Sequence, residues 1–499
     1  MSASLSQLIE EARSTGTLSG LPKSNFIDGQ WVDAESGARM ETYDPGTGKA
    51  YADFAASGAA EVDRAIAAAE REQYGRWRDV TPQERGAILR RAAQLVEENA
   101  ERLAVVETLD SGKSIGEAQG DVAGTARVIN YYAGLADKIH GETINSRRSH
   151  LTYTLREPLG VTAHIIPWNY PTSTLARGIA PALAAGCTVV AKPAETTPLT
   201  ALMLADLFQK AGLPDGVLNV VTGTGSEAGA PLVEDKRIRH ITFTGSVRTG
   251  VQVGQVAMRN VASTILELGG KSPFIALADC DMDRAVDDAV WAIYSNAGQI
   301  CSAGSRLVID RAIHEEFVAR VVEKARGITV GHGLGGADVG AINNPMQLEK
   351  VHGFVERARE RGRTVLCGGE TATDAENGGG WFYRPTLIDN VPSDDEVIQD
   401  EIFGPVLSVQ VVDGIEEAIT AANCTDFGLM SCVYTQDVSK ALRVARDLDT
   451  GQVSVNDYWA NGWDVPFGGT KLSGIGREKG TEGLEGYLQT KGVSIRIDG

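Results

Sequence analysis

Short, continuous apolar runs alternate with helical segments between residues 160 and 277. The runs are GVTAHIIPWN, CTVVAKPAE, VLNVVTGTG, IRHITFTGS and TILELGGKSPFIAL, and most of them lead into polar residues or glycine. Uninterrupted apolar strands separated by helices are typical of a parallel sheet that is covered on both faces. In open sheets of this kind, ligands bind at the carboxyl ends of the strands. The pattern therefore predicts an α/β fold with a ligand site at the ends of these runs.

A second set of alternating elements occupies roughly residues 275 to 460. It includes RLVI, WFYRPTLI, GPVLSVQVV, LMSCVYTQ and GQVSVN. Residues 60 to 135 are predicted to be helical, and TPQE at 81–84 has the sequence of a capping box, with Thr81 at the N-cap and Glu84 three residues later. These patterns predict two α/β domains preceded by a helical region.

Two segments alternate with a period of two instead. Leu151, Tyr153 and Leu155 lie on one face of a strand predicted near 140–158, and Val493 and Ile495 alternate with polar residues near the C-terminus. A strand with an apolar face and a free edge needs a partner. We therefore expect these segments to take part in an oligomer.

Composition narrows the classes of partner and location. The chain has 499 residues, with 47 basic and 66 acidic side chains and a net charge of −19, which argues against nucleic acid or an anionic membrane as a partner. The longest uncharged apolar stretch, 178–191, is too short to span a membrane, and no secretory signal is visible at the N-terminus. Six scattered cysteines lack the spacing of a disulfide framework or a zinc site. The expected location is the cytoplasm, and no metal site is expected.

One of these cysteines is a candidate nucleophile. Cys301 ends the segment NAGQIC, in which small residues surround the thiol. Neither a second cysteine nor a histidine lies near it in the sequence. On these residues alone, Cys301 is either a buried, inert thiol or a nucleophile with room for a substrate.

Two segments suggest a dinucleotide. FTGSVRTG places Gly245 and Gly250 between a strand and a helix, where backbone amides can face a pyrophosphate, although a simple tight turn is the alternative. KPAE places Lys192 and Glu195 after a strand, and a carboxylate in this place binds ribose hydroxyls. Because Glu195 would repel a 2′-phosphate, NAD is favoured over NADP.

Two further segments suggest acid–base chemistry. In IPWNYP, the amide of Asn169 is held between two prolines and could stabilise an oxyanion, or it could cap a turn. In LELGGKSP, Glu267 ends an apolar strand, so desolvation should raise its pKa and make it a general base. An ion pair between Glu267 and Lys271 is the alternative.

Seven segments, taken together and in order, resemble the NAD(P)-dependent aldehyde dehydrogenase superfamily. They are PWNYP, KPAE, FTGS, ELGGKSP, GQIC, EIFGPV and PFGGTKLSGIGRE, and the similarity runs from about residue 25 to the end. The resemblance implies a Rossmann-like cofactor domain (1–139 and 159–267), an α/β catalytic domain (268–477) and a small β oligomerisation arm (140–158 and 478–499). It also implies a homodimer or homotetramer.

The resemblance implies roles for the candidate residues. Cys301 attacks an aldehyde, Asn169 and the backbone N–H of Cys301 stabilise the oxyanion, and Glu267 activates the water that hydrolyses the resulting thioester to an acid. Members of the family that transfer the acyl group to phosphate or coenzyme A commonly lack this glutamate. The residues implied to hold the cofactor are Ile165, Pro167, Trp168, Lys192, Glu195, Gly225, Phe243, Gly245, Ser246, Glu401 and Phe403.

The substrate is less determined. Tyr170, Arg177 and Trp459 are expected in the substrate tunnel. Arg177 could bind a distal carboxylate, as in members similar to succinate-semialdehyde dehydrogenases, whereas the aromatic residues would suit an apolar, aromatic or quaternary-ammonium aldehyde. Two rival functions are a cysteine hydrolase or thioesterase without redox chemistry and a catalytically silent binding protein on the same fold.

Overall fold

The first large sheet has parallel strands at its centre. The computed structural model describes residues 4–460 and 462–497. Strands β9, β8, β7, β10 and β11 run parallel to one another, and antiparallel strands complete both edges. In sheet order the strands are β2 (Gln30–Val32), β1 (Asn25–Ile27), β9 (Leu218–Val220), β8 (Thr188–Lys192), β7 (Val161–Ile165), β10 (Ile238–Thr244), β11 (Ser263–Glu267) and β23 (Gly474–Ile475).

Helices cover both faces of this sheet, which explains the uninterrupted apolar runs. One face packs against α7 (Pro171–Ala185) and α8 (Leu199–Lys210), with further helices outside them; α2 (Ala59–Tyr74), α9 (Ala230–Glu234) and α10 (Val247–Arg259) lie on the other face. The outer helices are α4 (Pro82–Glu98), α5 (Ala100–Ser111) and α6 (Ile115–Leu135). The predicted capping box is confirmed, since the hydroxyl of Thr81 accepts a hydrogen bond from the backbone N–H of Glu84 at the start of α4.

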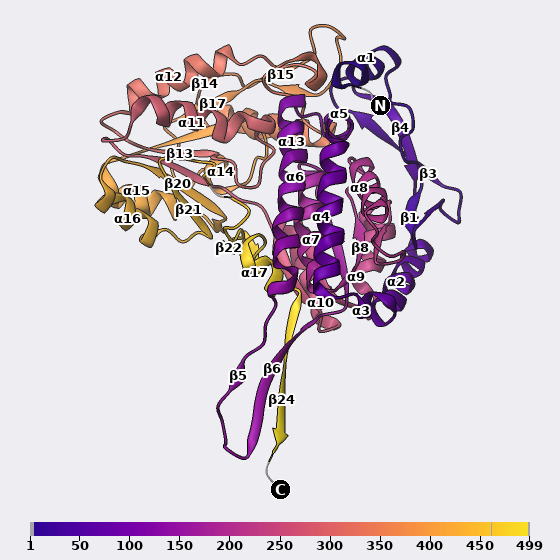
Figure 1. Ribbon diagram of the computed structural model, residues 1–499. Coiled ribbons are helices and arrows are strands. Elements are labelled where there is room, and N and C mark those ends of the chain that lie inside the picture. Colours follow the sequence, from indigo (N-terminus) through magenta and orange to yellow (C-terminus); the bar gives the residue numbers. More distant parts are fainter. Residues whose placement is uncertain (1–3, 461, 498–499) are drawn as a thin grey trace.

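The second large sheet forms the other half of the body (Figure 1). Its strands are, in sheet order, β14 (Thr364–Cys367), β17 (Thr386–Asp389), β18 (Val406–Val412), β13 (Arg306–Asp310), β12 (Pro273–Ala276), β20 (Met430–Tyr434) and β21 (Gln452–Val455). All neighbours are parallel except β14 and β17. The helices packed on it are α11 (Met282–Tyr294), α12 (His314–Gly327), α13 (Pro345–Glu360), α15 (Gly414–Ala422) and α16 (Val438–Asp447).

A narrow three-stranded sheet projects from the body like a handle (Figure 1). It consists of β5 (Thr143–Ile144), β6 (His150–Pro158) and β24 (Leu488–Arg496), and β6 pairs with β24 along its whole length. Leu151, Leu155 and Ile495 expose about two-fifths of their surface, at 43%, 40% and 44%. The predicted strands therefore pair with each other and leave apolar side chains uncovered.

One short strand departs from the predicted domain limits. β23 lies within the segment assigned to the catalytic domain, 268–477, but it pairs antiparallel with β11 of the first sheet. Gly474 has a φ of 139°, and a Cβ there would lie 1.9 Å from the carbonyl oxygen of Leu266. Glycine thus allows the chain to return to the first sheet at this point.

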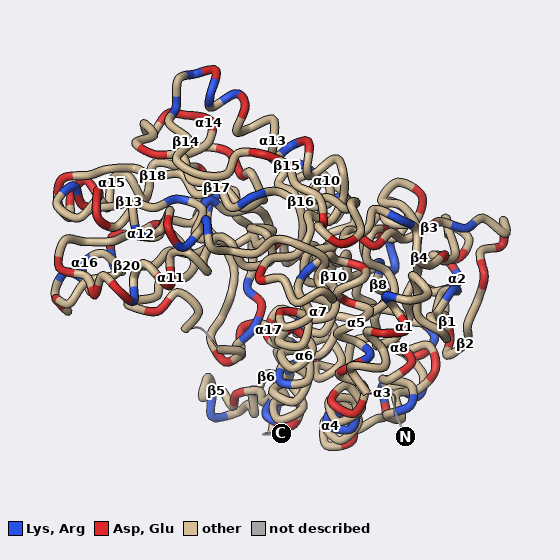
Figure 2. Tube along the Cα trace, turned by 90° about the horizontal axis from the view of Figure 1, so that it is seen from above, with Lys and Arg blue, Asp and Glu red and all other residues tan. Residues whose placement is uncertain are grey.

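The remaining α-helices and strands lie outside the three sheets described above. They are α1 (Leu5–Thr15), α3 (Arg76–Asp79), α14 (Glu396–Gln399), α17 (Gly480–Glu485), β3 (Arg39–Asp44), β4 (Lys49–Ala55), β15 (Thr371–Ala372), β16 (Phe382–Tyr383), β19 (Phe427–Gly428) and β22 (Thr470–Lys471). Acidic and basic residues are interspersed along the outer elements (Figure 2). Among the described residues, no helix combines the length and the apolar character that crossing a bilayer requires.

Candidate active site

The predicted catalytic residues meet in one cavity of about 160 Å³ beyond the carboxyl ends of the first sheet's strands. We call it the reaction cavity. It also contains six of the predicted cofactor residues. Its lining consists of Pro167, Trp168, Asn169, Thr244, Gly245, Ser246, Glu267, Leu268, Gly269, Cys301, Gln347, Lys350, Glu401 and Phe403. Segments from both halves of the body therefore converge where strands β7, β10 and β11 end.

A second cavity of about 170 Å³, which we call the distal cavity, holds four more of the predicted cofactor residues: Ile165, Lys192, Gly225 and Phe243. Its other lining residues are largely apolar and come from α9 and α10, as Val233, Val253 and Val256 do. A flat aromatic base fits such a lining. Glu195 lies beside this cavity, and its carboxylate is 3.5 Å from the ammonium of Lys192.

A left-handed turn places Cys301 in the reaction cavity. After α11, Asn296, Ala297 and Gly298 have φ values of 47°, 52° and 71°. A Cβ on Gly298 would lie 2.1 Å from the carbonyl oxygen of Gly404, so this position requires glycine. Burial raises the pKa of the Cys301 thiol to about 12, and the charge of Glu267 adds to the rise while Arg177 opposes it.

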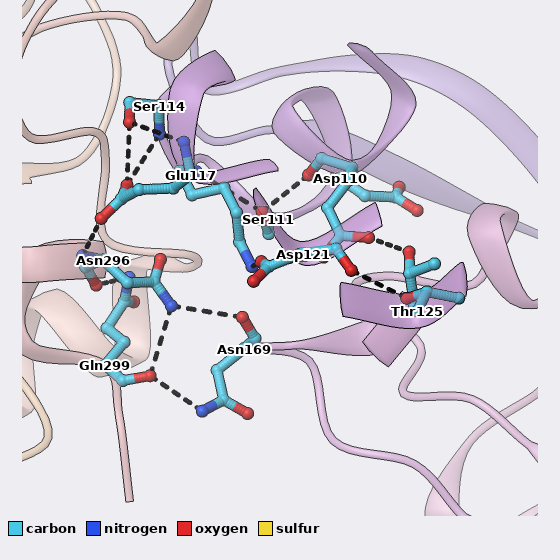
Figure 3. A network of polar contacts seen from close by, with 12 residues as sticks. Asp110, Ser111, Ser114, Glu117, Asp121, Thr125, Asn169, Asn296 and Gln299 are labelled. Atoms are coloured by element: carbon cyan, nitrogen blue, oxygen red, sulfur yellow. Dashed lines mark hydrogen bonds and ion pairs between the residues drawn. The ribbon is translucent and has the colours of Figure 1, made fainter. Parts of the chain in front are cut away.

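Asn169 is buried and held by the turn that precedes Cys301. Its side-chain amide donates a hydrogen bond to the carbonyl oxygen of Gln299 over 2.8 Å, and the amide of Asn296 donates to the carbonyl oxygen of Asn169 over 3.2 Å. The backbone N–H of Asn296 donates in turn to the carboxylate of Glu117 on α6 over 2.5 Å (Figure 3). Because a side-chain amide has two N–H groups, one stays available to a ligand.

Glu267 is a buried carboxyl group without a partner. Neither of its oxygens accepts a hydrogen bond from the residues that the structure describes. Burial raises its pKa well above the usual value, and the nearby Glu478 carboxylate adds to the rise. The alternative ion pair with Lys271 is not formed within the described chain, where the Lys271 ammonium also lacks a hydrogen-bond partner. Glu267 therefore has the properties of a general base.

Glu401 and Phe403 form the opposite wall of the reaction cavity. The backbone N–H of Gly270 donates to the Glu401 carboxylate over 2.9 Å. A Cβ on Gly269 would approach that carboxylate to 2.5 Å, so the glycine makes room for it. The ring of Phe403 meets Trp168 edge to face, with 5.3 Å between the centroids. These contacts fix two aromatic walls and a carboxylate beside Cys301.

The predicted substrate residues lie in different surroundings. Arg177 forms an ion pair with Glu478, and their side chains are only 14% and 2% exposed. This differs from the prediction that Arg177 binds a substrate carboxylate, because its charge is already compensated. Tyr170 has the Lys113 ammonium 4.2 Å from its ring centroid, whereas Trp459 is 47% exposed and packs edge to face on Tyr458. Their contact with a substrate stays a prediction.

Sequence reasoning missed five lining residues of the reaction cavity, of which Thr244, Leu268 and Gly269 lie within quoted motifs and two lie outside them. Gln347 and Lys350 lie on α13, and the Gln347 amide donates to the carbonyl oxygens of Ile402 and Phe403 over 3.0 and 2.8 Å. No quoted motif covers α13, so its sequence carried no signal. Glu478, by contrast, lies in the quoted PFGGTKLSGIGRE segment, which could have suggested it.

The two cavities fit a dinucleotide. The hydroxyl of Thr244 lines the reaction cavity, is buried and lacks a hydrogen-bond partner among the described residues, as expected for a group that binds a ligand. Ser246 caps α10, whose first backbone amides face the same region. In the described part of the chain, no cluster of three or more histidine, cysteine or acidic side chains could hold a metal.

Comparison with known proteins gives the same family throughout. Residues 31–493 match the model of the aldehyde dehydrogenase family. An aldehyde dehydrogenase from Aspergillus niger is 42% identical over 478 residues, which cover 95% of each chain. A hydroxyisobutyraldehyde dehydrogenase from Mycolicibacterium austroafricanum is 41% identical, covering 97% of this chain and 95% of the relative.

Solved structures agree with these relatives. The NAD⁺ complex of an aldehyde dehydrogenase from Bacillus cereus superposes with a TM-score of 0.94 at 39% identity, covering 97% of this chain and 99% of that one. Betaine aldehyde dehydrogenase from Staphylococcus aureus, also in complex with NAD⁺, gives a TM-score of 0.94 at 36% identity, with coverages of 98% and 96%. With its sequence matched almost throughout and its fold shared, the chain belongs to the aldehyde dehydrogenase family.

Proposed function

We propose that Cys301, Asn169 and Glu267 carry out the NAD-dependent oxidation of an aldehyde to a carboxylic acid that family membership assigns to this chain. The observation that supports these roles is the reaction cavity, in which a thiol, an available amide and an unpaired buried carboxyl group line one space. Nucleophile, oxyanion donor and base are the groups that acyl chemistry on sulfur requires.

The first step forms a carbon–sulfur bond. Glu267 accepts the thiol proton, and the sulfur of Cys301 attacks the aldehyde carbon. The carbonyl oxygen becomes an oxyanion that accepts hydrogen bonds from the Asn169 amide and the backbone N–H of Cys301. Burial raises the pKa values of both the Cys301 thiol and the Glu267 carboxyl group. The cavity therefore disfavours the charged form of each group.

The second step leaves an acyl group on Cys301. NAD, when bound, supplies the hydride acceptor and a positive charge beside the sulfur. Lys192 and Glu195 would hold its adenosine ribose, and Glu401 and Phe403 the nicotinamide end. Glu267 next gives up the thiol proton to solvent, which regenerates its carboxylate. It then takes a proton from water, whose oxygen attacks the thioester, so that the acid leaves and the sulfur is released as thiolate.

This function is tested by following NADH and acid together. We expect NADH to appear only when an aldehyde is added, with one equivalent of carboxylic acid formed per NADH. A cysteine hydrolase would instead cleave a thioester without forming NADH. A silent binding protein would bind NAD and turn over neither substrate, and either result would contradict the proposal.

The preference for NAD over NADP is a further proposal that rests on Glu195. Its carboxylate stands beside Lys192 at the edge of the distal cavity and would repel a 2′-phosphate. We expect Glu195→Gln to raise kcat/KM for NADP about tenfold relative to NAD, since one like-charge contact is worth on the order of 1 kcal/mol near the surface. Initial rates with both cofactors measure this ratio, and an unchanged ratio would assign the preference to another residue.

Assembly and location are also proposed. The uncovered apolar side chains of β6 and β24 support a homodimer or homotetramer, which sedimentation velocity would establish; a monomer would contradict it.

The cysteines of the described chain are all free, as expected for a reducing cytoplasm, and cell fractionation would test that location.

A further inference from the structure

Lys479 carries a charge that is not matched by an ion pair within the described part of the chain. Its ammonium lies 4.7 Å from the ring centroid of Trp463 and 5.0 Å from that of Phe467. Within the residues that the structure describes, it forms neither a hydrogen bond nor an ion pair with an acidic side chain. The neighbouring Arg177 differs, because its charge is matched by Glu478. The charges of Arg177 and Glu478 offset each other, so the ammonium of Lys479 is the unpaired positive charge among these three residues.

The same contacts place Lys479 close to the reacting groups. The ring of Phe467 packs against the guanidinium of Arg177, at 5.1 Å, as well as against Lys479. At the next residue, Gly468, a Cβ would lie 2.9 Å from a carboxylate oxygen of Glu267. Phe467 and Lys479 do not line the reaction cavity, so the segment that carries Gly468 adjoins Glu267 outside the set of cavity-lining residues.

Burial and the positive charge of Arg177 both disfavour the charged form of Lys479. Burial lowers the pKa of Lys479 to about 8, and the positive charge of Arg177 lowers it further. Negative charges on Glu478, Cys301 and Glu267 have the opposite effect on the pKa of Lys479. An anion bound here would remove the penalty.

The backbone and the packing hold the ammonium in this place. Lys479 has a φ of 58°, a conformation that long side chains seldom adopt, and it directly precedes α17. Trp463 reaches it by lying against α6, where Gly124 makes room for the indole: a Cβ on Gly124 would be 2.9 Å from the ring. Two aromatic walls, Trp463 and Phe467, therefore flank the ammonium of Lys479 within one segment of the chain, and α6 supports the indole.

We propose that Lys479 selects aldehydes that carry a carboxylate at the end distal from the carbonyl group. The inference rests on the proposed function and names the substrate class for that site. The rings of Trp463 and Phe467 would pack on the carbon chain of the substrate, while Lys479 pairs with its carboxylate. A single free ammonium matches a monoanion better than a phosphate dianion. The same charge disfavours quaternary-ammonium aldehydes, which would otherwise suit these aromatic faces.

The test compares three aldehydes of similar length: 4-oxobutanoate, butanal and 4-trimethylaminobutanal. For the unaltered enzyme we expect kcat/KM to be about 10- to 100-fold higher for 4-oxobutanoate than for butanal, the effect of one charge-assisted hydrogen bond. The trimethylammonium compound should be the poorest of the three. Lys479→Met should reduce the ratio between the first two at least tenfold, and Lys479→Arg should retain most of it.

Lys210→Met is the matched control, because Lys210 is an exposed lysine on α8 that pairs with Asp206. Its substrate ratio should equal that of the unaltered enzyme. An equal ratio in Lys479→Met, or an unaltered enzyme that does not prefer 4-oxobutanoate, would overturn the inference.

A binding measurement separates this inference from the proposed function. Succinate, the product acid, should bind the NAD complex of the unaltered enzyme in calorimetry at least tenfold more tightly than that of Lys479→Met or Lys479→Gln. If no aldehyde produced NADH, the proposed function would fail, while succinate binding would still decide the role of Lys479. Equal succinate binding by all variants would overturn that role even if aldehydes were oxidised.

Discussion

Cys301→Ala is expected to lower kcat for aldehyde oxidation by roughly a thousandfold or more. Alanine removes the only atom that can form the carbon–sulfur bond, and the remaining Asn169 amide and Glu267 carboxyl group have no acyl-enzyme to act on. Cys301 is one of the fourteen residues that line the reaction cavity, and it does not line the distal cavity. NAD binding should therefore stay measurable by fluorescence titration.

Cys280→Ala is the matched control for this variant. Cys280 lies in the turn between β12 and α11, partly exposed, and it does not line the reaction cavity. Its burial raises the pKa of the thiol to about 11, so both cysteines are poorly ionised and differ mainly in their surroundings. Normal turnover by Cys301→Ala would remove the nucleophile from the mechanism, whereas loss of activity in both variants would indicate a general sensitivity to cysteine replacement.

The sequence predicts the elements whose burial is periodic or continuous. Strands β7 and β8 are buried on both faces, which leaves an uninterrupted apolar run that can be recognised without a structure. Each of these strands ends where a ligand site is expected, and Asn169, Lys192 and Glu267 all lie in or next to such strand ends. The residues of the candidate site that lie at strand ends could thus be predicted, because neighbouring strands bring them together.

What the sequence could not predict depends on packing between distant segments. The resemblance places Arg177 in the substrate tunnel, but its ion-pair partner Glu478 comes from the far end of the chain, and no local pattern connects the two. β23 is only two residues long and has no pattern to detect. The position of Gln347 depends on how α13 is rotated against the cavity, and its sequence alone does not determine that rotation.

Glu267→Gln should separate the two halves of the reaction. Glutamine keeps the shape of the side chain but cannot accept a proton from water, so steady-state turnover should fall by about 100- to 1000-fold. The first half also loses the acceptor of the thiol proton, but it is less affected, because the charge of Glu267 contributes to the raised pKa of Cys301 and its removal favours the thiolate. Rapid mixing with aldehyde and NAD should therefore show a burst of about one NADH per subunit before the slow phase.

The dependence on pH follows from the same carboxyl group. Its pKa is raised by burial, and only the deprotonated form activates water, so the rate of the unaltered enzyme should increase as pH rises through that elevated pKa. In Glu267→Gln this contribution is lost, and any remaining increase reports the thiol, whose pKa is raised to about 12. Comparing the two pH profiles of kcat thus assigns one ionisation to Glu267.

Two further measurements identify the species that accumulates after the burst. Intact-mass analysis of Glu267→Gln should show one acyl group per subunit, located on the peptide that contains Cys301, and hydroxylamine should restore turnover because it attacks a thioester without a base. Glu485→Gln, at an exposed glutamate on α17, should behave like the unaltered enzyme. Full steady-state turnover by Glu267→Gln without an acyl adduct would show that another group activates water. The role of Glu267 would then be limited to accepting the thiol proton.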